Sequence, residues 1–310
     1  MFLPRKILFL RPNFRQVEFM KTIIAILCLT MALLCGLVGG SGANDLDNLL
    51  EAAKNGSPRA QYELGLKYQE GEGVPQSYEA AAKWYKRAAK QNFPQAQDGL
   101  GFLHTHGYGV TWDRAAALQW YQRAVDQGFP RAQFNLGMMH FRGLGVPVSF
   151  ENARTLWGMA AEQGYADAKY RLGLIYELAR GVDRDFEKAH SWYRRGAEQG
   201  HAPSQFKLGW MYRKGISVDQ DDETAVIWFQ RSAERGYLEA MWNMAVMYNI
   251  GKGIEQDRDR AYMWASLASA RGSKYGTEIT YHLTKLMSKA DVTAAKKLAQ
   301  ACLRRNYKGC

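Results

Sequence analysis

The sequence lacks the short motifs that mark the common classes of enzyme active site. It contains no G-x-x-x-x-G-K phosphate loop, no H-E-x-x-H zinc motif and no G-x-S-x-G nucleophile elbow. Its carboxylates are plentiful, but most fall at the predicted starts of helices, where they cap backbone amides. His104 and His106 could suggest a metal site, but His104 falls in a column of rings described below and is expected to be structural. We therefore expect no catalytic residue, no metal and no cofactor.

The sequence also has no run of lysine and arginine, although its formal net charge is +11. Without residues 1–43, which are discussed below, 36 basic and 29 acidic side chains remain, a net charge of +7. Nucleic-acid binding requires basic residues that cluster on one face. We therefore expect no nucleic-acid partner.

Cysteine is scarce, with four residues in the chain. Cys28 and Cys35 lie in the predicted export signal, so an exported chain would keep only Cys302 and Cys310. In an oxidising compartment these two are expected to form a disulfide that fastens the C-terminal tail. The alternative is two free thiols on a frayed end.

What the sequence does contain is a repeat of 36 residues. A fixed period of this size indicates a solenoid, in which each repeat buries its apolar face only by stacking on its neighbours. The most regular element is a Leu-Gly step, found at Leu64-Gly65, Leu100-Gly101, Leu136-Gly137, Leu172-Gly173 and Leu208-Gly209, and weakened to Met244-Ala245.

The first half of each repeat predicts an α-helix of about eleven residues, here called helix A. A small residue precedes the leucine by four positions and a ring follows it by four, and this spacing places all three on one helix face. The small residues are Ala60, Ala96, Ala132, Ala168, Ser204 and Ala240, and the rings are Tyr68, His104, His140, Tyr176, Tyr212 and Tyr248.

A glycine turn leads to a second helix, here called helix B. The turn reads G-x-G-V or G-x-G-I in most repeats, but Ala179 and Ser217 interrupt it in the fourth and fifth, where we expect a different turn. Helix B opens with Ser or Asp, both good N-cap residues, and ends at Asn92 or at a glycine. The N-cap residues are Ser77, Asp113, Ser149, Asp185, Asp221 and Asp257.

Helix B combines an alanine column with bulky pairs three and four positions further on. We expect the tryptophans of these pairs to lie in the core, so that truncation of Trp120 would lower stability by about 3–5 kcal/mol. The alanines are Ala81, Ala117, Ala153, Ala189, Ala225 and Ala261, and the pairs are Trp84-Tyr85, Trp120-Tyr121, Leu156-Trp157, Trp192-Tyr193, Trp228-Phe229 and Trp264-Ala265.

These columns resemble the Sel-one-like repeat (SLR) family, a relative of the tetratricopeptide repeats. The resemblance covers about residues 45–305 and includes six copies of the motif, at 57–92, 93–128, 129–164, 165–200, 201–236 and 237–272. It implies an all-α fold, a right-handed α-α superhelix that acts as a scaffold or adaptor. Some cysteine-rich family members are linked to β-lactam binding, but their cysteine pairs within repeats are absent here.

The segments that flank the repeats predict an export signal and two caps. Lys21 precedes an apolar run at 22–38, and Ser41-x-Ala43 supplies the small residues of a cleavage site. We predict a signal peptide at 1–43 and a periplasmic or secreted protein; the alternative is an uncleaved membrane anchor. Residues 44–56 predict an N-terminal capping helix, and residues 273–310 predict C-terminal capping helices with a capping box at Ser288-x-x-Asp291.

A binding face is expected on helix A, at positions −5, −2, +2, +5 and +6 from the leucine; we call these positions the helix A face. Positions −2 and +2 are rich in large apolar residues with arginine nearby, a composition typical of interface hot spots. The alternative is that these residues are core between repeats. The predicted partner-binding residues are Tyr62, Phe102, Arg131, Phe134, Met138, Arg142, Tyr170, Phe206, Trp210, Arg213 and Trp242.

The sequence therefore predicts an exported, non-catalytic scaffold that binds a protein partner. A second hypothesis is a peptidoglycan-binding or glycan-binding envelope protein, whose aromatic residues would stack on sugar rings. A third, weaker hypothesis is a hydrolase of β-lactams or of the cell wall.

Overall fold

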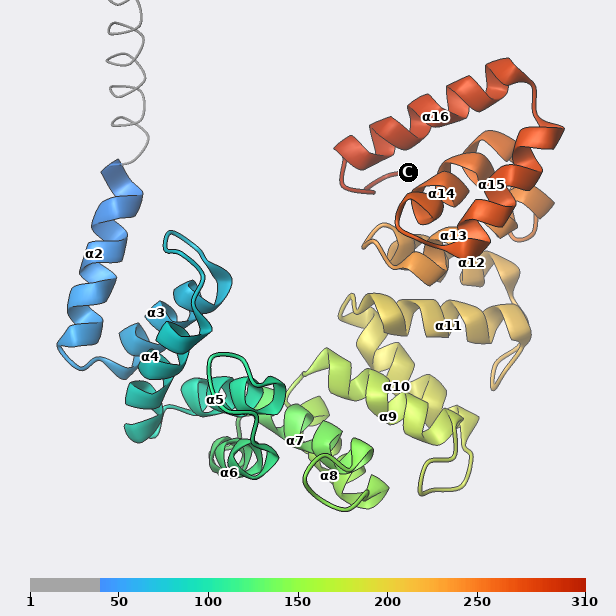
Figure 1. Cartoon of the computed structure of the whole chain (residues 1–310). Coiled ribbons are helices and arrows are strands. Elements are labelled where there is room, and N and C mark those ends of the chain that lie inside the picture. The colour runs from blue at the N-terminus through green and yellow to red at the C-terminus, as the bar shows by residue number, and fades with distance from the viewer. Residues whose placement is uncertain (1–39) are drawn as a thin grey trace, which may run out of the picture. The chain divides into compact units, whose positions relative to one another are not determined.

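The computed structural model describes residues 40–310, with side chains from Asp45 onward. The described residues form fifteen α-helices and no strand (Figure 1). The first is α2 (Gly40–Lys54), and the last two are α15 (Lys274–Leu286) and α16 (Lys289–Arg304). Between them lie six pairs of helices A and B: α3 (Pro58–Glu70) and α4 (Tyr78–Lys90), α5 (Pro94–His106) and α6 (Arg114–Val125), α7 (Pro130–Arg142) and α8 (Phe150–Glu162), α9 (Ala166–Glu177) and α10 (Phe186–Glu198), α11 (Ala202–Lys214) and α12 (Asp222–Ala233), α13 (Leu238–Ile250) and α14 (Arg258–Ala270).

The predicted all-α fold of helix-pair repeats is confirmed. The predicted signal peptide lies outside the described residues, apart from residues 40–43 at the start of α2. The described residues divide into two compact units, one comprising those up to Ala96 with His106–Thr111, the other Gln97–Thr105 with Trp112–Cys310. Within the second unit, consecutive helices pack in pairs from α6 to α14.

The two helices of a repeat start in different ways. Helix B starts at its predicted cap: the Ser77 side chain accepts a hydrogen bond from the Ala80 amide, and Asp221 accepts one from Thr224. The inner A helices start instead at a ring, without a side-chain cap bond, at Phe129, Tyr165, His201 and Tyr237. A serine is the N-cap of the first A helix, at Ser57, and of the C-terminal helix α15, at Ser273.

The Leu-Gly step exists because the buried ring of helix B lies flat against the glycine. A Cβ built on Gly173 would lie 2.4 Å from the Tyr193 ring, and one on Gly137 would lie 2.5 Å from the Trp157 ring. The sixth repeat has Ala245 in place of this glycine, and Ala265 stands where the ring would be. The Cβ is therefore tolerated only where the ring is missing.

The expectation that the tryptophan column is core is wrong for four repeats. Trp84, Trp120, Trp192 and Trp228 are half-buried, whereas the ring that follows each of them is buried. An arginine three residues further on covers each indole, with the guanidinium carbon 4.3–4.7 Å from the ring centroid. The first bulky residue of the pair faces outward because the second already fills the space against the Leu-Gly step.

The expectation of different turns is wrong for the fifth repeat and for the backbone conformation at Ala179, although α9 ends one residue earlier in the fourth repeat. Ala179 has φ 55° and Ser217 has φ 60°, so both adopt the left-handed conformation that glycine adopts in the other repeats. The turn also packs on the preceding repeat, since a Cβ on Gly181 would lie 2.7 Å from Cβ of Phe150. This packing fixes the turn even where the residue is not glycine.

Glutamine side chains fasten the first repeat to the end of α2 and the turn after it, and the third repeat to the second. The buried Gln61 donates to the Ala53 carbonyl at 3.0 Å, and its own carbonyl accepts from Gln91 at 2.9 Å. Gln91 also donates to Gly56 at 2.9 Å, and Gln163 repeats both bonds with Gln133 and Gly128. These bonds satisfy carbonyl groups that the helix ends leave free.

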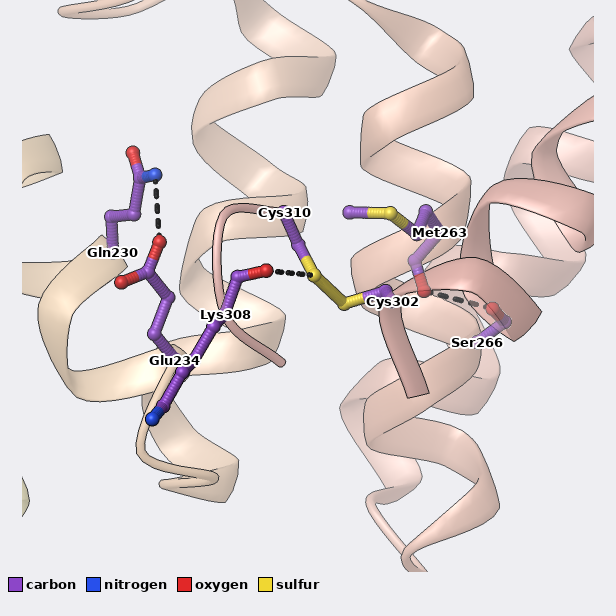
Figure 2. Close-up of a disulfide and its surroundings, with 7 residues drawn as sticks. All are labelled: Gln230, Glu234, Met263, Ser266, Cys302, Lys308 and Cys310. Carbon is purple, nitrogen blue, oxygen red and sulfur yellow. Dashed lines mark hydrogen bonds between the residues drawn. A yellow bond between two sulfur atoms is a disulfide. The ribbon is translucent and has the colours of Figure 1, made fainter. Parts of the chain in front are cut away.

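The C-terminal cap closes the array with α15, α16 and a disulfide. The predicted capping box is present, since Ser288 and Asp291 exchange side-chain bonds to each other's backbone amides. The predicted Cys302–Cys310 disulfide is also present and closes the tail into a loop (Figure 2). Among residues 40–310, no helix is both long and apolar enough to cross a membrane.

Candidate functional site

The predicted aromatic residues at position −2 are neither fully exposed nor part of a closed core. Each is half-buried and contacts the buried ring of helix B in its own repeat, as Phe206 does with Phe229 at a centroid distance of 5.6 Å. Tyr62 and Tyr85 lie 5.6 Å apart, Phe134 and Trp157 6.3 Å. Trp242, whose repeat lacks this ring, lies 5.0 Å from Tyr275 instead.

A second column of rings completes this packing, and the sequence analysis missed it. These are the rings that open the inner A helices, and Tyr165, His201 and Tyr237 each contact the position −2 ring of the repeat before it. Phe134 lies 5.2 Å from Tyr165, and Phe206 lies 5.4 Å from Tyr237. The missed signal was an aromatic residue or histidine directly after the glycine that ends helix B. Position −2 is therefore largely structural.

The predicted residues at position +2, which are Phe102, Met138 and Trp210, are half-buried as well. Met138 packs against the cluster around Trp157, and Trp210 contacts the buried cores of two repeats. These side chains join repeat to repeat while leaving part of their surface open.

Two of the three predicted arginines have structural partners. Arg131 donates from Nε to the buried Asp98 carboxylate at 2.5 Å, and Asn135 binds the other oxygen at 2.9 Å. Burial raises the pKa of Asp98, while Arg131 and Asn135 oppose that rise. Arg213 donates to Asn243 at 2.9 Å, which links α11 to α13, whereas Arg142 is exposed.

Glu177, at position +5, is likewise held by hydrogen bonds from neighbouring side chains. Its carboxylate accepts hydrogen bonds from the Tyr193 hydroxyl at 2.5 Å and from the Lys207 ammonium at 2.7 Å. Burial and the neighbouring carboxylate raise the pKa of the Tyr193 hydroxyl. Because Glu177 already accepts these two hydrogen bonds, we do not count it as a salt-bridge partner for the pocket arginines described next.

One apolar hollow opens on the helix A face, and we call it the α7–α9 pocket. It has a volume of about 200 Å³ and lies between the A helices of the third and fourth repeats, with the buried Trp157 in its wall. Leu178 at its rim is 49% exposed. The pocket is lined by Phe141, Trp157, Arg171, Leu174, Ile175, Leu178 and Arg180.

The two arginines give this apolar pocket a positive rim. Neither Arg171 nor Arg180 forms an ion pair within the described part of the chain. The Arg171 guanidinium instead lies 5.9 Å from the Tyr170 ring centroid. The nearby Asp167 interacts electrostatically with Arg171, but neither guanidinium group is held in a salt bridge by a described residue. An apolar floor beside two such groups suits a partner that presents an apolar side chain next to a carboxylate.

The strained residue Ala179 lies directly between two lining residues of this pocket. A left-handed conformation is unfavourable for alanine by roughly 1–2 kcal/mol, and such strain is common at binding sites. Helix α9 ends one residue earlier than α7 does relative to the Leu-Gly step, which frees Leu178 for the rim. The departure of this turn from G-x-G was the sequence signal that could have located the pocket.

A larger hollow lies at the C-terminal ends of α10 and α12, but it offers no comparable chemistry. Its volume is about 730 Å³, and its wall carries both acidic and basic side chains, among them Glu198, Glu234, Arg231 and Arg235. With Lys308, the wall holds three basic and two acidic side chains, so carboxylates already lie among its cations, and Gln205 donates to the Ala197 carbonyl at 3.1 Å. We therefore place the candidate site at the α7–α9 pocket.

Within residues 40–310, no group of three or more His, Cys, Asp or Glu side chains is placed to hold a metal ion. His104 is half-buried in its ring column, and His106 stacks on Tyr108 at 5.3 Å. His104 thus lies in the ring column of helix A, and His106 lies against a tyrosine ring at the surface.

Comparison with known proteins identifies the repeat. The sequence profile of the Sel1 repeat matches residues 58–93, 94–129, 130–165, 166–201, 202–237 and 238–273. The crystal structure of a Sel1 repeat protein from Oxalobacter formigenes is similar, with 33% identity, a TM-score of 0.68, and coverage of 70% of this chain and 89% of that chain.

Two further structures match at lower similarity. A protective antigen of uropathogenic Escherichia coli with an SLR fold is 24% identical over 84% of this chain and 87% of that chain, with a TM-score of 0.33. An immunity protein from Pseudomonas aeruginosa is 20% identical over 73% and 81%, with a TM-score of 0.46. No match is found among curated proteins.

Proposed function

The chain belongs to the Sel1 repeat family, whose fold is typical of protein-interaction scaffolds, and on this premise we propose that it is an exported scaffold that binds a protein partner at the α7–α9 pocket. Sel1 repeat proteins bind protein partners and are generally non-catalytic. The proposal that this chain is exported to the periplasm or beyond rests on the charged, apolar and small-residue pattern of residues 21–43.

The observation that carries the site is the combination of shape and charge in one place. Phe141, Leu174 and Leu178 offer an apolar surface, and Arg171 and Arg180 offer two cations that form no salt bridge within the described residues. A partner segment with an apolar anchor and an adjacent carboxylate would fill the hollow and pair with the guanidinium groups. Buried apolar anchors flanked by arginine are the usual centres of protein interfaces.

Photo-crosslinking in cells tests this site. A photoreactive residue at position 178, on the pocket rim, is expected to give a defined protein adduct. Position 227 on α12 is the matched control, because Ile227 is 50% exposed, as Leu178 is 49% exposed, but lies on a B helix. Absence of a protein adduct from position 178, or the same adducts from both positions, would contradict the proposed site.

A further inference from the structure

The C-terminal cap carries almost all of the excess positive charge of residues 44–310. Residues 274–310 contain eight Lys or Arg and two Asp or Glu, a net charge of +6, whereas residues 44–273 contain 28 and 27, a net charge of +1. All eight basic side chains are exposed, and none forms an ion pair within the described residues. The eight are Lys274, Lys285, Lys289, Lys296, Lys297, Arg304, Arg305 and Lys308.

Four of these cations form a stripe along one side of α16. On α16, residues 289, 296, 297 and 304 share one side, because steps of seven residues return to nearly the same direction. Ala295, Ala299 and Cys302 are buried on the opposite side.

Large apolar side chains are also exposed on this cap. Tyr281 is 64% exposed and lies under the Lys285 ammonium, 4.2 Å from its ring centroid. Leu286 at the bend is 51% exposed, and Leu298 and Leu303 on α16 are 41% and 50% exposed. A cap that only shielded the array from water would need polar residues at these places.

We propose that this cap is a membrane-docking surface that binds a bilayer containing anionic phospholipid. Lysine and arginine near an anionic bilayer surface each add to binding, and tyrosine and leucine settle at the boundary between headgroups and acyl chains. Nucleic acid would account for the cations but not for the exposed leucines. The docking is peripheral, since no helix within residues 40–310 is suited to cross the membrane.

Lysine footprinting on the full chain tests this surface without the partner. Acetylation by a water-soluble reagent, read by mass spectrometry, compares vesicles of phosphatidylcholine alone with vesicles of equal parts phosphatidylcholine and phosphatidylglycerol. We expect phosphatidylglycerol to slow the acetylation of Lys289, Lys296 and Lys297 several-fold. The exposed lysines of α4, Lys83 and Lys86, are expected to react equally with both and serve as the internal reference.

Charge-reversal variants test whether vesicle binding depends on this surface or only on the net charge of the protein. The variant Lys289→Glu/Lys296→Glu/Lys297→Glu is expected to lose about a hundredfold in the phosphatidylglycerol-dependent part of vesicle binding. The control Lys83→Glu/Lys86→Glu/Lys90→Glu makes the same change in net charge on α4 and is expected to keep that binding. Circular dichroism of both variants checks that the helices are intact.

Three results would overturn the proposal. Phosphatidylglycerol could leave the α16 lysines as reactive as before, or the two charge-reversal variants could lose binding equally. Soluble polyglutamate or duplex DNA could also protect the α16 lysines while vesicles do not, which would assign the surface to an acidic protein or to nucleic acid.

Discussion

At the scale of single residues, the contact between each Leu-Gly step and the ring of helix B is the most demanding feature of the repeat. Gly173→Ala would place a Cβ 2.4 Å from the Tyr193 ring, so the ring or the helix must shift. We expect the variant to lose about 1–3 kcal/mol of unfolding free energy, as overpacked cores do, measured by urea denaturation.

The matched control is Gly158→Ala, in the middle of α8, where a Cβ meets nothing within 4 Å. That variant should gain up to about 1 kcal/mol from helix propensity. The double variant Gly173→Ala/Tyr193→Ala copies Ala245 and Ala265 of the sixth repeat and should lose less than the sum of its single changes. Equal effects of Gly173→Ala and Gly158→Ala would contradict this account of the step.

Arg131 was predicted to bind a partner, but its contact with Asp98 makes it a structural residue. Arg131→Ala leaves the Asp98 carboxylate buried without its cation and should lower stability by about 2 kcal/mol at neutral pH, because the half-exposed arginine is partly screened by solvent. Burial already raises the pKa of Asp98 in the folded chain, and removing Arg131 raises that pKa further.

The sign of the pH dependence follows from this shift. An acid whose pKa is raised by folding binds its proton more tightly in the native state, so stability is greatest below the unfolded pKa and falls as pH rises through the folded pKa. The loss caused by Arg131→Ala should therefore grow from mildly acidic to neutral pH. Urea denaturation across this range measures it, and Arg131→Ala/Asp98→Asn should show a flatter profile; a loss independent of pH would contradict the assignment.

At the scale of elements, the turns show where sequence patterns mislead. A missing glycine at Ala179 and Ser217 suggested different turns, yet both residues adopt the glycine conformation because the turn is packed against the preceding repeat. The N-caps of helix B, by contrast, were predictable residue by residue, because an N-cap depends only on the side chain and the next three amides.

Ala179→Gly tests the strain in the turn beside the pocket. Glycine adopts the left-handed conformation without the Cβ penalty, so the variant should gain about 0.5–1 kcal/mol, seen as a higher midpoint in urea. Ala294→Gly, at an exposed site inside α16, is the control and should lose about 1 kcal/mol. A destabilised Ala179→Gly variant would show that the turn is not strained.

At the scale of the whole molecule, the 36-residue period predicted the all-α array and the helix pairs, because these follow from local spacing. The disulfide was predicted separately, from the two cysteines that remain outside the predicted export signal. The candidate site was predicted less well. The predicted helix A face stays a prediction; its positions +2, +5 and +6 include Leu174, Phe141 and Leu178 of the proposed pocket. Most of the aromatic residues chosen at position −2 pack against a ring from the next repeat, and a single repeat does not reveal that contact.

The affinity of the partner captured at position 178 tests the central claim most directly, by calorimetric titration of the purified chain. Arg171→Glu/Arg180→Glu should weaken binding at least about tenfold, because like charges then face the partner's carboxylate. Lys86→Glu/Lys90→Glu on α4 should leave the affinity unchanged, with neither variant altered in thermal stability. An unchanged affinity in Arg171→Glu/Arg180→Glu would show that the α7–α9 pocket does not bind the partner.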